Sequence, residues 1–171
     1  MLKKFQTAGA IFTIAAGTLL HFVYEWTGEN KLAAIFSAVN ESTWEHLKLL
    51  AIPLIFFAVI EYFAYGKRLK NFVPVKILSA FVGMSAIVVI FYTYVGVVGR
   101  HFLWADIATF VAGVLAAYAF SAHFLRGDRF SSRTAISLAW LALLMTLVGF
   151  ALFTFYPPRL GIFLDPTLGG K

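Results

Sequence analysis

The stretch VNESTWEHLKLLAIPLIFFAVIEYFAY, residues 39–65, joins a polar start to a long apolar run. Its apolar part, residues 43–65, exceeds the roughly 20 residues that an α-helix needs to cross a bilayer. Ser42 and Glu45 match a capping box, in which the serine is the N-cap and the glutamate is the third helical residue. The stretch therefore predicts a transmembrane helix with ionisable side chains around its first turn.

Two charged residues inside this apolar run, Lys48 and Glu61, stand 13 positions apart in the sequence. At a rise of about 1.5 Å per residue they are separated by only ~20 Å along a helix, whereas the hydrocarbon core of a bilayer is ~30 Å thick. At least one of the two charges must therefore enter the membrane zone, extend toward the surface or face protein.

The composition of the whole chain supports a membrane protein. Of 171 residues, 61% are hydrophobic, 13% are charged and 19 are Phe, and the mean hydropathy is +0.84. A soluble domain is typically about half apolar and about a quarter charged, so a soluble fold could not hide this much apolar surface. The absence of Cys excludes disulfides and thiolate metal sites. The net charge of +6 is not accompanied by a basic patch interleaved with solvent-facing aromatic residues, so we predict no nucleic-acid partner.

Four further apolar segments have a similar length. The five segments together are residues 5–26, 43–65, 72–98, 102–124 and 134–156. Helices satisfy their own backbone hydrogen bonds in lipid, and the alternating pattern of barrel strands does not occur here. Small residues four apart, such as Gly113 and Ala117, allow helices to approach closely. We predict an all-α polytopic membrane protein, a single-domain bundle of five transmembrane helices over residues 1–171, whose oligomeric state is open.

Basic residues are concentrated in alternate connections of this bundle. Three connections carry most of them: Lys3 and Lys4, then Lys67, Arg68 and Lys70, then Arg126, Arg129 and Arg133. The positive-inside rule places these connections in the cytoplasm, so the N-terminus is predicted to be cytoplasmic and the C-terminus outside. The start MLKK followed by an apolar run also resembles a signal peptide. The length of the run and the His and Glu near its end favour a retained helix.

The predicted topology brings most of the remaining ionisable residues to the outer face. They come from the end of the first segment, the start of the second and the start of the fourth: His21, Glu25, Glu41, Glu45, His46, His101 and Asp106. Imidazole and carboxylate groups are ligands for Zn²⁺, Mn²⁺ or non-haem iron, and they also serve as general acids and bases. We predict a divalent-metal site, with Zn²⁺ the first candidate. Its ligands would come from His21, Glu25, Glu41, His46 and His101. Glu45 and Asp106 are the predicted catalytic groups.

The same residues also fit purely structural roles. Glu45 fits a capping role, and His21 with Glu25 fits a hydrogen-bonded pair at the headgroup level. His101 lies at a loop edge and fits a solvated histidine, whereas Asp106 lies deeper and fits a buried partner. No HExxH pair, GxSxG elbow, Walker loop or GxGxxG motif occurs.

Three stretches, LHFVYEWTG, FSAVNESTWEHLKLL and YPPRLGIFLDPTLGG, resemble a family of small bacterial integral membrane proteins of unknown function. The resemblance covers most of the chain and implies a multi-pass protein of the bacterial plasma membrane. It implies no activity and assigns no residue a catalytic role.

Three functions are compatible with these observations. The first is a metal-binding membrane protein that hydrolyses a lipid or small amphiphile at the outer leaflet, with RLGIFLDPTLGG, residues 159–170, folding back as a lid. The second is a small transporter or ion-coupled carrier, although the middle of every segment is almost wholly apolar and transporters usually bind at the midplane. The third is a non-catalytic structural or partner-binding subunit, in which the polar cluster orders helix ends.

Overall fold

The computed structural model describes residues 1–165 and contains six α-helices and two short 3₁₀ helices within that range. Their bounds are α1 (Leu2–Trp26), α2 (Lys31–Phe36), α3 (Thr43–Ala64), η1 (Gly66–Arg68), α4 (Phe72–Val98), α5 (Leu103–Phe124), α6 (Arg133–Phe155) and η2 (Gly161–Phe163). The prediction of an all-α fold is confirmed. Five of the helices are long and apolar enough to cross a membrane, and they match the five predicted segments.

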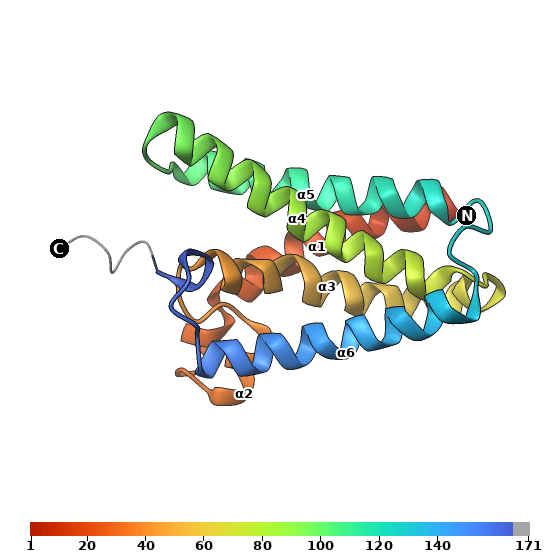
Figure 1. Cartoon of the computed structure of the whole chain (residues 1–171), viewed down its shortest axis with the longest axis horizontal. Coiled ribbons are helices and arrows are strands. Elements are labelled where there is room, and N and C mark those ends of the chain that lie inside the picture. Colours follow the sequence, from red (N-terminus) through yellow and green to blue (C-terminus); the bar gives the residue numbers. More distant parts are fainter. Residues whose placement is uncertain (166–171) are drawn as a thin grey trace.

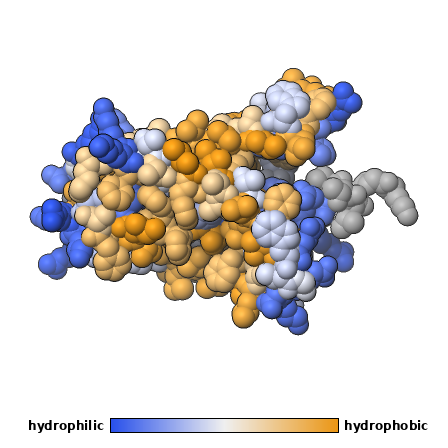
Figure 2. All heavy atoms as spheres, turned by 180° about the vertical axis from the view of Figure 1, so that it is seen from behind, coloured by the Kyte–Doolittle hydropathy of each residue, from blue (hydrophilic) through white to orange (hydrophobic). Residues whose placement is uncertain are grey.

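The five long helices run side by side, and successive connections lie at alternate ends of the bundle (Figure 1). We call these the α2 end, which also holds the start of α3 and η2, and the η1 end, which also holds the start of α1. Figure 2 shows an apolar belt between two hydrophilic ends. Side chains on this belt, such as Leu144 at 57% and Met145 at 63% exposure, face outward. This is the surface expected of a bundle that lipid surrounds.

Helix α2 was not predicted, because six residues carry no periodic pattern long enough to be recognised. Asn30 begins it by accepting a hydrogen bond from the Leu32 backbone N–H at 2.8 Å. The start of α3 follows the predicted cap only in part. The Ser42 hydroxyl accepts from the Glu45 N–H at 3.4 Å, but the Ser42 N–H donates to Asn40 Oδ1 rather than to the Glu45 carboxylate.

Helix α3 lies at the centre of the bundle. Its buried residues between Lys48 and Glu61 are all apolar, and they pack with α1, α4 and α5. Glycine allows two close approaches. A side chain at Gly17 would meet the Leu49 carbonyl oxygen at 2.3 Å, and one at Gly113 would meet the Gly83 carbonyl oxygen at 2.9 Å. The second contact agrees with the predicted small-residue packing of α5.

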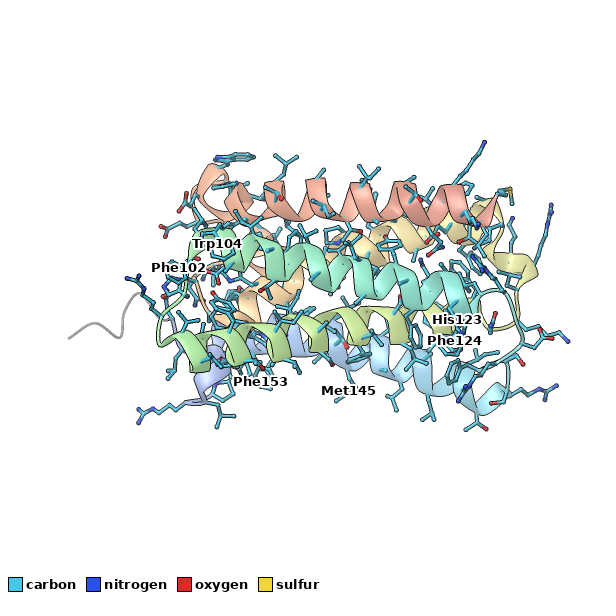
Figure 3. All side chains as sticks on the ribbon, turned by 90° about the horizontal axis from the view of Figure 1, so that it is seen from above. Phe102, Trp104, His123, Phe124, Met145 and Phe153 are labelled. Carbon is cyan, nitrogen blue, oxygen red and sulfur yellow. The ribbon has the colours of Figure 1, made fainter. Side chains whose placement is uncertain are left out.

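Helix α6 packs least closely. Ala139 and Phe150 are its only buried residues, and about half of its residues are exposed, including Met145 (Figure 3). The seam between α6 and the α3–α4 pair is partly open.

Candidate functional site

The α2 end brings together the end of α1, the chain before α3 and the first turn of α3. These segments carry His21, Glu41 and His46, which form a cluster with one ligand atom from each residue within 4.8 Å of the others. The Glu41 carboxylate lies between the two imidazoles. Its oxygens are 3.7 Å from His21 Nε2 and 3.4 Å from His46 Nε2. The imidazole ring centres of His21 and His46 are 5.2 Å apart.

Hydrogen bonding determines which nitrogen of His46 is available. Its Nδ1 lies 2.9 Å from the Ser42 carbonyl oxygen, and a carbonyl can only accept, so Nδ1 carries the proton. In the neutral ring Nε2 then carries a lone pair, and this atom faces Glu41. A histidine that donates from one nitrogen to a backbone carbonyl and offers the other is the usual arrangement of a metal ligand.

His21 has an unsatisfied nitrogen. Its Nδ1 is buried and makes no hydrogen bond, while Nε2 faces Glu41. The side chains of His21, Glu41 and His46 remain 33%, 47% and 32% exposed. Water and a small ligand can therefore reach the cluster, although it lies against the helix ends.

The C-terminal segment covers part of this end. The Glu41 N–H donates to Asp165 Oδ2 at 3.3 Å. Phe163 in η2 packs against Trp44 and Phe153, with ring centres 4.9 Å and 5.3 Å away. Residues 159–165 of the predicted lid thus lie at the α2 end, where the cluster is. Residues 166–170 of the predicted lid lie outside the residues that the structure describes.

Glu45, predicted to be catalytic, is 2% exposed and points away from the cluster into the protein. Its Oε2 lies 2.6 Å from the ammonium of Lys48 and accepts from the Val39 N–H at 3.1 Å, and its Oε1 accepts from the Thr154 hydroxyl at 2.9 Å. Both oxygens are occupied, so the geometry gives Glu45 a structural contact among three segments of the chain.

His101 and Asp106 form a second group on the α4–α5 turn, which diverges from α3 at its tip (Figure 1). Asp106 Oδ1 accepts a hydrogen bond from Tyr94, and its Oδ2 lies 3.1 Å from His101 Nδ1. Phe102 and Trp104 mark this turn in Figure 3, at the opposite end from His123 and Phe124. Glu25 is exposed at the end of α1 and is not one of the three converging residues. The five predicted ligands therefore divide into one group of three and two separate residues.

A second buried polar group, at the η1 end, had not been expected. Lys76 of α4 lies 2.5 Å from Glu61, whose other oxygen accepts from Gln6 and Tyr65 at 2.6 Å each. The spacing of Lys48 and Glu61 had indicated that charges enter the protein. The burial of Lys76 could also be predicted from the sequence, because a cation inside an apolar helix needs an anionic partner. The sequence analysis did not single out Lys76, because it lies near the start of a long apolar segment.

Five helices long and apolar enough to cross a membrane indicate a membrane protein, and its described residues place a His/Glu cluster at one end of the bundle. The chain belongs to DUF6512, a family of unknown function, which matches residues 1–171. The match confirms membership of a family of unknown function, while the expectation that the family consists of bacterial integral membrane proteins stays a prediction. Searches of curated proteins and of solved structures found no match.

Proposed function

We propose that this protein spans a plasma membrane five times and binds a divalent cation, Zn²⁺ first, at its outer face through His21, Glu41 and His46. The single observation that carries the metal proposal is the convergence of two imidazoles on one carboxylate without a direct hydrogen bond between them.

The distances support a shared ion. A protonated imidazole paired with a carboxylate closes to about 2.7–2.9 Å, whereas the Nε2 atoms of His46 and His21 stand 3.4 and 3.7 Å from Glu41. Two ligands bonded to zinc at about 2.1 Å in tetrahedral geometry lie about 3.4 Å apart. The two imidazole–carboxylate distances are therefore close to the spacing of ligands around an ion. All three ligand atoms lie within 4.8 Å of one another, and side-chain rotations would bring them into range.

The orientation rests on charge. Within residues 1–165 the η1 end exposes eight basic residues and one acid, Asp128. The basic residues are Lys3, Lys4, Lys67, Arg68, Lys70, Arg126, Arg129 and Arg133. The positive-inside rule assigns this end to the cytoplasm, which places the N-terminus inside and the His/Glu cluster outside.

A zinc ion held by two imidazoles and one carboxylate keeps a position for water, as catalytic zinc sites do. An ion held by His21, Glu41 and His46 would lower the pKa of a bound water and so supply a nucleophile for the hydrolysis of an ester to an acid and an alcohol. Because the site lies where α1 and α3 reach the bilayer surface, we propose a lipid or small amphiphile as the substrate class.

Two other functions receive less support. A carrier usually binds its cargo near the membrane midplane, whereas the buried residues of α3 between Lys48 and Glu61 are all apolar. A purely structural role for the cluster would favour direct ion pairs at shorter distances than those observed.

Metal binding is tested on detergent-purified protein stripped with chelator and titrated with ZnCl₂ by calorimetry. We expect one zinc per chain, with affinity reduced by roughly tenfold or more in His46→Ala and Glu41→Gln, because each removes a ligand. His123→Ala, at the η1 end, and Glu29→Gln are the matched controls and should bind as wild type. Absence of stoichiometric zinc, or equal binding by all four variants, would exclude the site.

Hydrolysis is tested separately with a p-nitrophenyl acyl ester in mixed micelles. We expect zinc-dependent release of p-nitrophenol that Glu41→Gln abolishes and His123→Ala retains. Stoichiometric zinc without ester cleavage would limit the function to metal binding.

A further inference from the structure

The seam between α3, α4 and α6 contains a cavity of about 340 Å³ toward the η1 end. Its walls include Ala58 and Tyr62 of α3, Val73 and Ile77 of α4, and Trp140 and Leu143 of α6. These walls are almost wholly apolar. The cavity is partly open, and its lining residues Val59 and Trp140 are exposed, so it is accessible from the apolar outer surface of the bundle.

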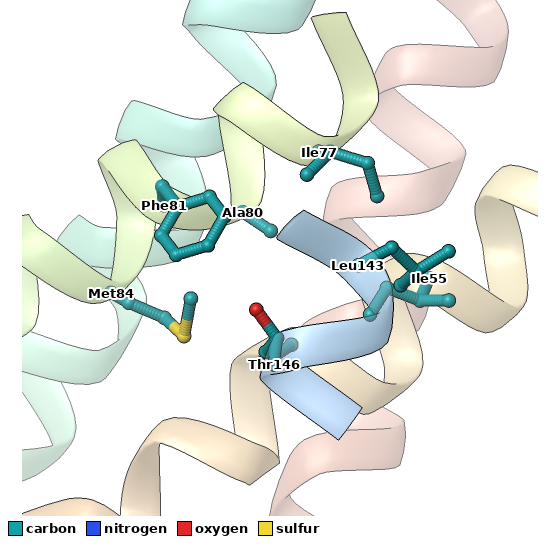
Figure 4. A pocket seen from close by; sticks show the side chains of 8 residues that line it. Ile55, Ile77, Ala80, Phe81, Met84, Leu143 and Thr146 are labelled. Atoms are coloured by element: carbon teal, nitrogen blue, oxygen red, sulfur yellow. The ribbon is translucent and has the colours of Figure 1, made fainter. Parts of the chain in front are cut away.

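The seam continues toward the middle of the bundle as a narrow crevice between Met84 and Thr146 (Figure 4). Ile77 and Leu143 line both the cavity and the crevice. The crevice itself has a volume of only about 10 Å³, so the space that a chain could fill is the larger cavity. That cavity extends along α3 from Leu54 to Tyr62, a rise of ~12 Å, which is most of the ~15 Å depth of one leaflet.

The charges around the cavity differ between its wall and its rim. Lys76 contributes to the wall, but its ammonium is paired with Glu61 and it is 2% exposed, so the wall offers no free charge. The end of the bundle next to the cavity is basic, and we call its four residues the rim. Lys67 and Arg68 lie in η1, Lys70 lies two residues before α4, and Arg133 begins α6 about two turns before Trp140. All four rim residues are exposed.

An apolar cavity at a basic end of the bundle matches one kind of occupant. We propose that the seam binds an anionic phospholipid of the surrounding leaflet, with one acyl chain in the cavity and the phosphate on the basic rim. This inference depends on the proposal that the helices span a bilayer, and it is independent of the metal site. A second copy of the chain fits less well, because a two-fold contact through this seam would bring two basic rims together.

The test uses full-length protein in detergent, with palmitoyl-oleoyl phosphatidylglycerol and phosphatidylcholine as probes and bound lipid counted by native mass spectrometry. We expect wild type to bind phosphatidylglycerol in preference to phosphatidylcholine. Leu143→Trp fills the cavity and should reduce binding of both lipids by roughly tenfold, which corresponds to the loss of about two buried methylene contacts. The matched control is Leu138→Trp, on the exposed face of the same helix, and it should bind as wild type.

Charge is tested with the double variant Lys70→Gln/Arg133→Gln. It should lose roughly tenfold or more of the preference for phosphatidylglycerol while still binding phosphatidylcholine, because each basic residue contributes to attraction for an anionic headgroup. Lys3→Gln/Lys4→Gln removes two charges at the same end, from a helix that does not line the cavity, and should keep the preference.

Three results would overturn the proposal. They are equal lipid binding by Leu143→Trp and Leu138→Trp, an unchanged headgroup preference in Lys70→Gln/Arg133→Gln, and a dimer that Leu143→Trp abolishes. Circular dichroism and size exclusion verify folding, and Ala58→Leu replaces Leu143→Trp if the larger residue prevents it. His46→Ala should bind lipid as wild type, so failure of the metal proposal and failure of this one are distinguishable.

Discussion

Lys48 makes a buried ion pair whose disruption gives the sharpest test of the fold. The lysine is 0% exposed, and its ammonium lies 2.6 Å from Glu45 Oε2. The same ammonium donates to the carbonyl oxygens of Ala34 at 2.8 Å and Ser37 at 3.1 Å, and to the Thr154 hydroxyl at 2.6 Å. One cation thus joins α2, α3 and α6 at the α2 end.

Replacing Glu45 by Gln keeps the shape of the side chain but leaves the Lys48 ammonium buried without a counter-charge. Replacing Lys48 by Met leaves the Glu45 carboxylate buried without a counter-charge. Removal of one partner from a buried pair costs about 3–5 kcal/mol, and the unfolding midpoint of a chain of this size should fall by roughly 6–20 °C. The double variant Glu45→Gln/Lys48→Met buries no charge, so it should be more stable than either single variant.

The assay is reversible unfolding in mixed micelles, followed by circular dichroism, for wild type, both single variants and the double variant. Glu29→Gln, an exposed change of the same chemistry, is the control and should unfold within about 0.5 kcal/mol of wild type. Costs below about 1 kcal/mol for both singles, or a double variant that loses the sum of the two, would refute the reasoning, because coupled charges cannot give additive losses.

Two further predictions follow from close packing and from topology. Gly17→Ala should destabilise the bundle by about 1–3 kcal/mol, since its new methyl group would lie 2.3 Å from the Leu49 carbonyl oxygen. Gly96→Ala, with nothing within 4 Å, should stay within about 1 kcal/mol of wild type in the same unfolding assay, and equal effects would argue against the α1–α3 contact. Because the chain has no Cys, single cysteines report sidedness directly. A membrane-impermeant maleimide should label Lys31→Cys on intact cells and Lys67→Cys only after permeabilisation, and labelling of both on intact cells would contradict five crossings.

Composition and segment length were sufficient to predict the five long helices. An apolar run such as residues 43–65 has few alternatives in lipid, where a helix satisfies its own backbone hydrogen bonds. The starts of helices could also be predicted, because a capping residue such as Ser42 bonds to a backbone N–H only a few positions away. Alternation of the five segments correctly brought the end of α1 and the start of α3 to one end of the bundle. The assignment of the basic end to the cytoplasm stays a prediction.

The sequence alone could not predict which residues form the candidate site. Helix direction placed seven ionisable residues at one end, but rotation of each helix about its axis determines which of them meet. Glu45 and His46 are neighbours in the first turn of α3, yet His46 faces Glu41 while Glu45 faces the Lys48 ammonium inside the protein. That rotation depends on packing between distant segments, such as Gly17 against Leu49, and on buried pairs such as Lys76 with Glu61. These contacts link residues far apart in the sequence, so local patterns do not contain them.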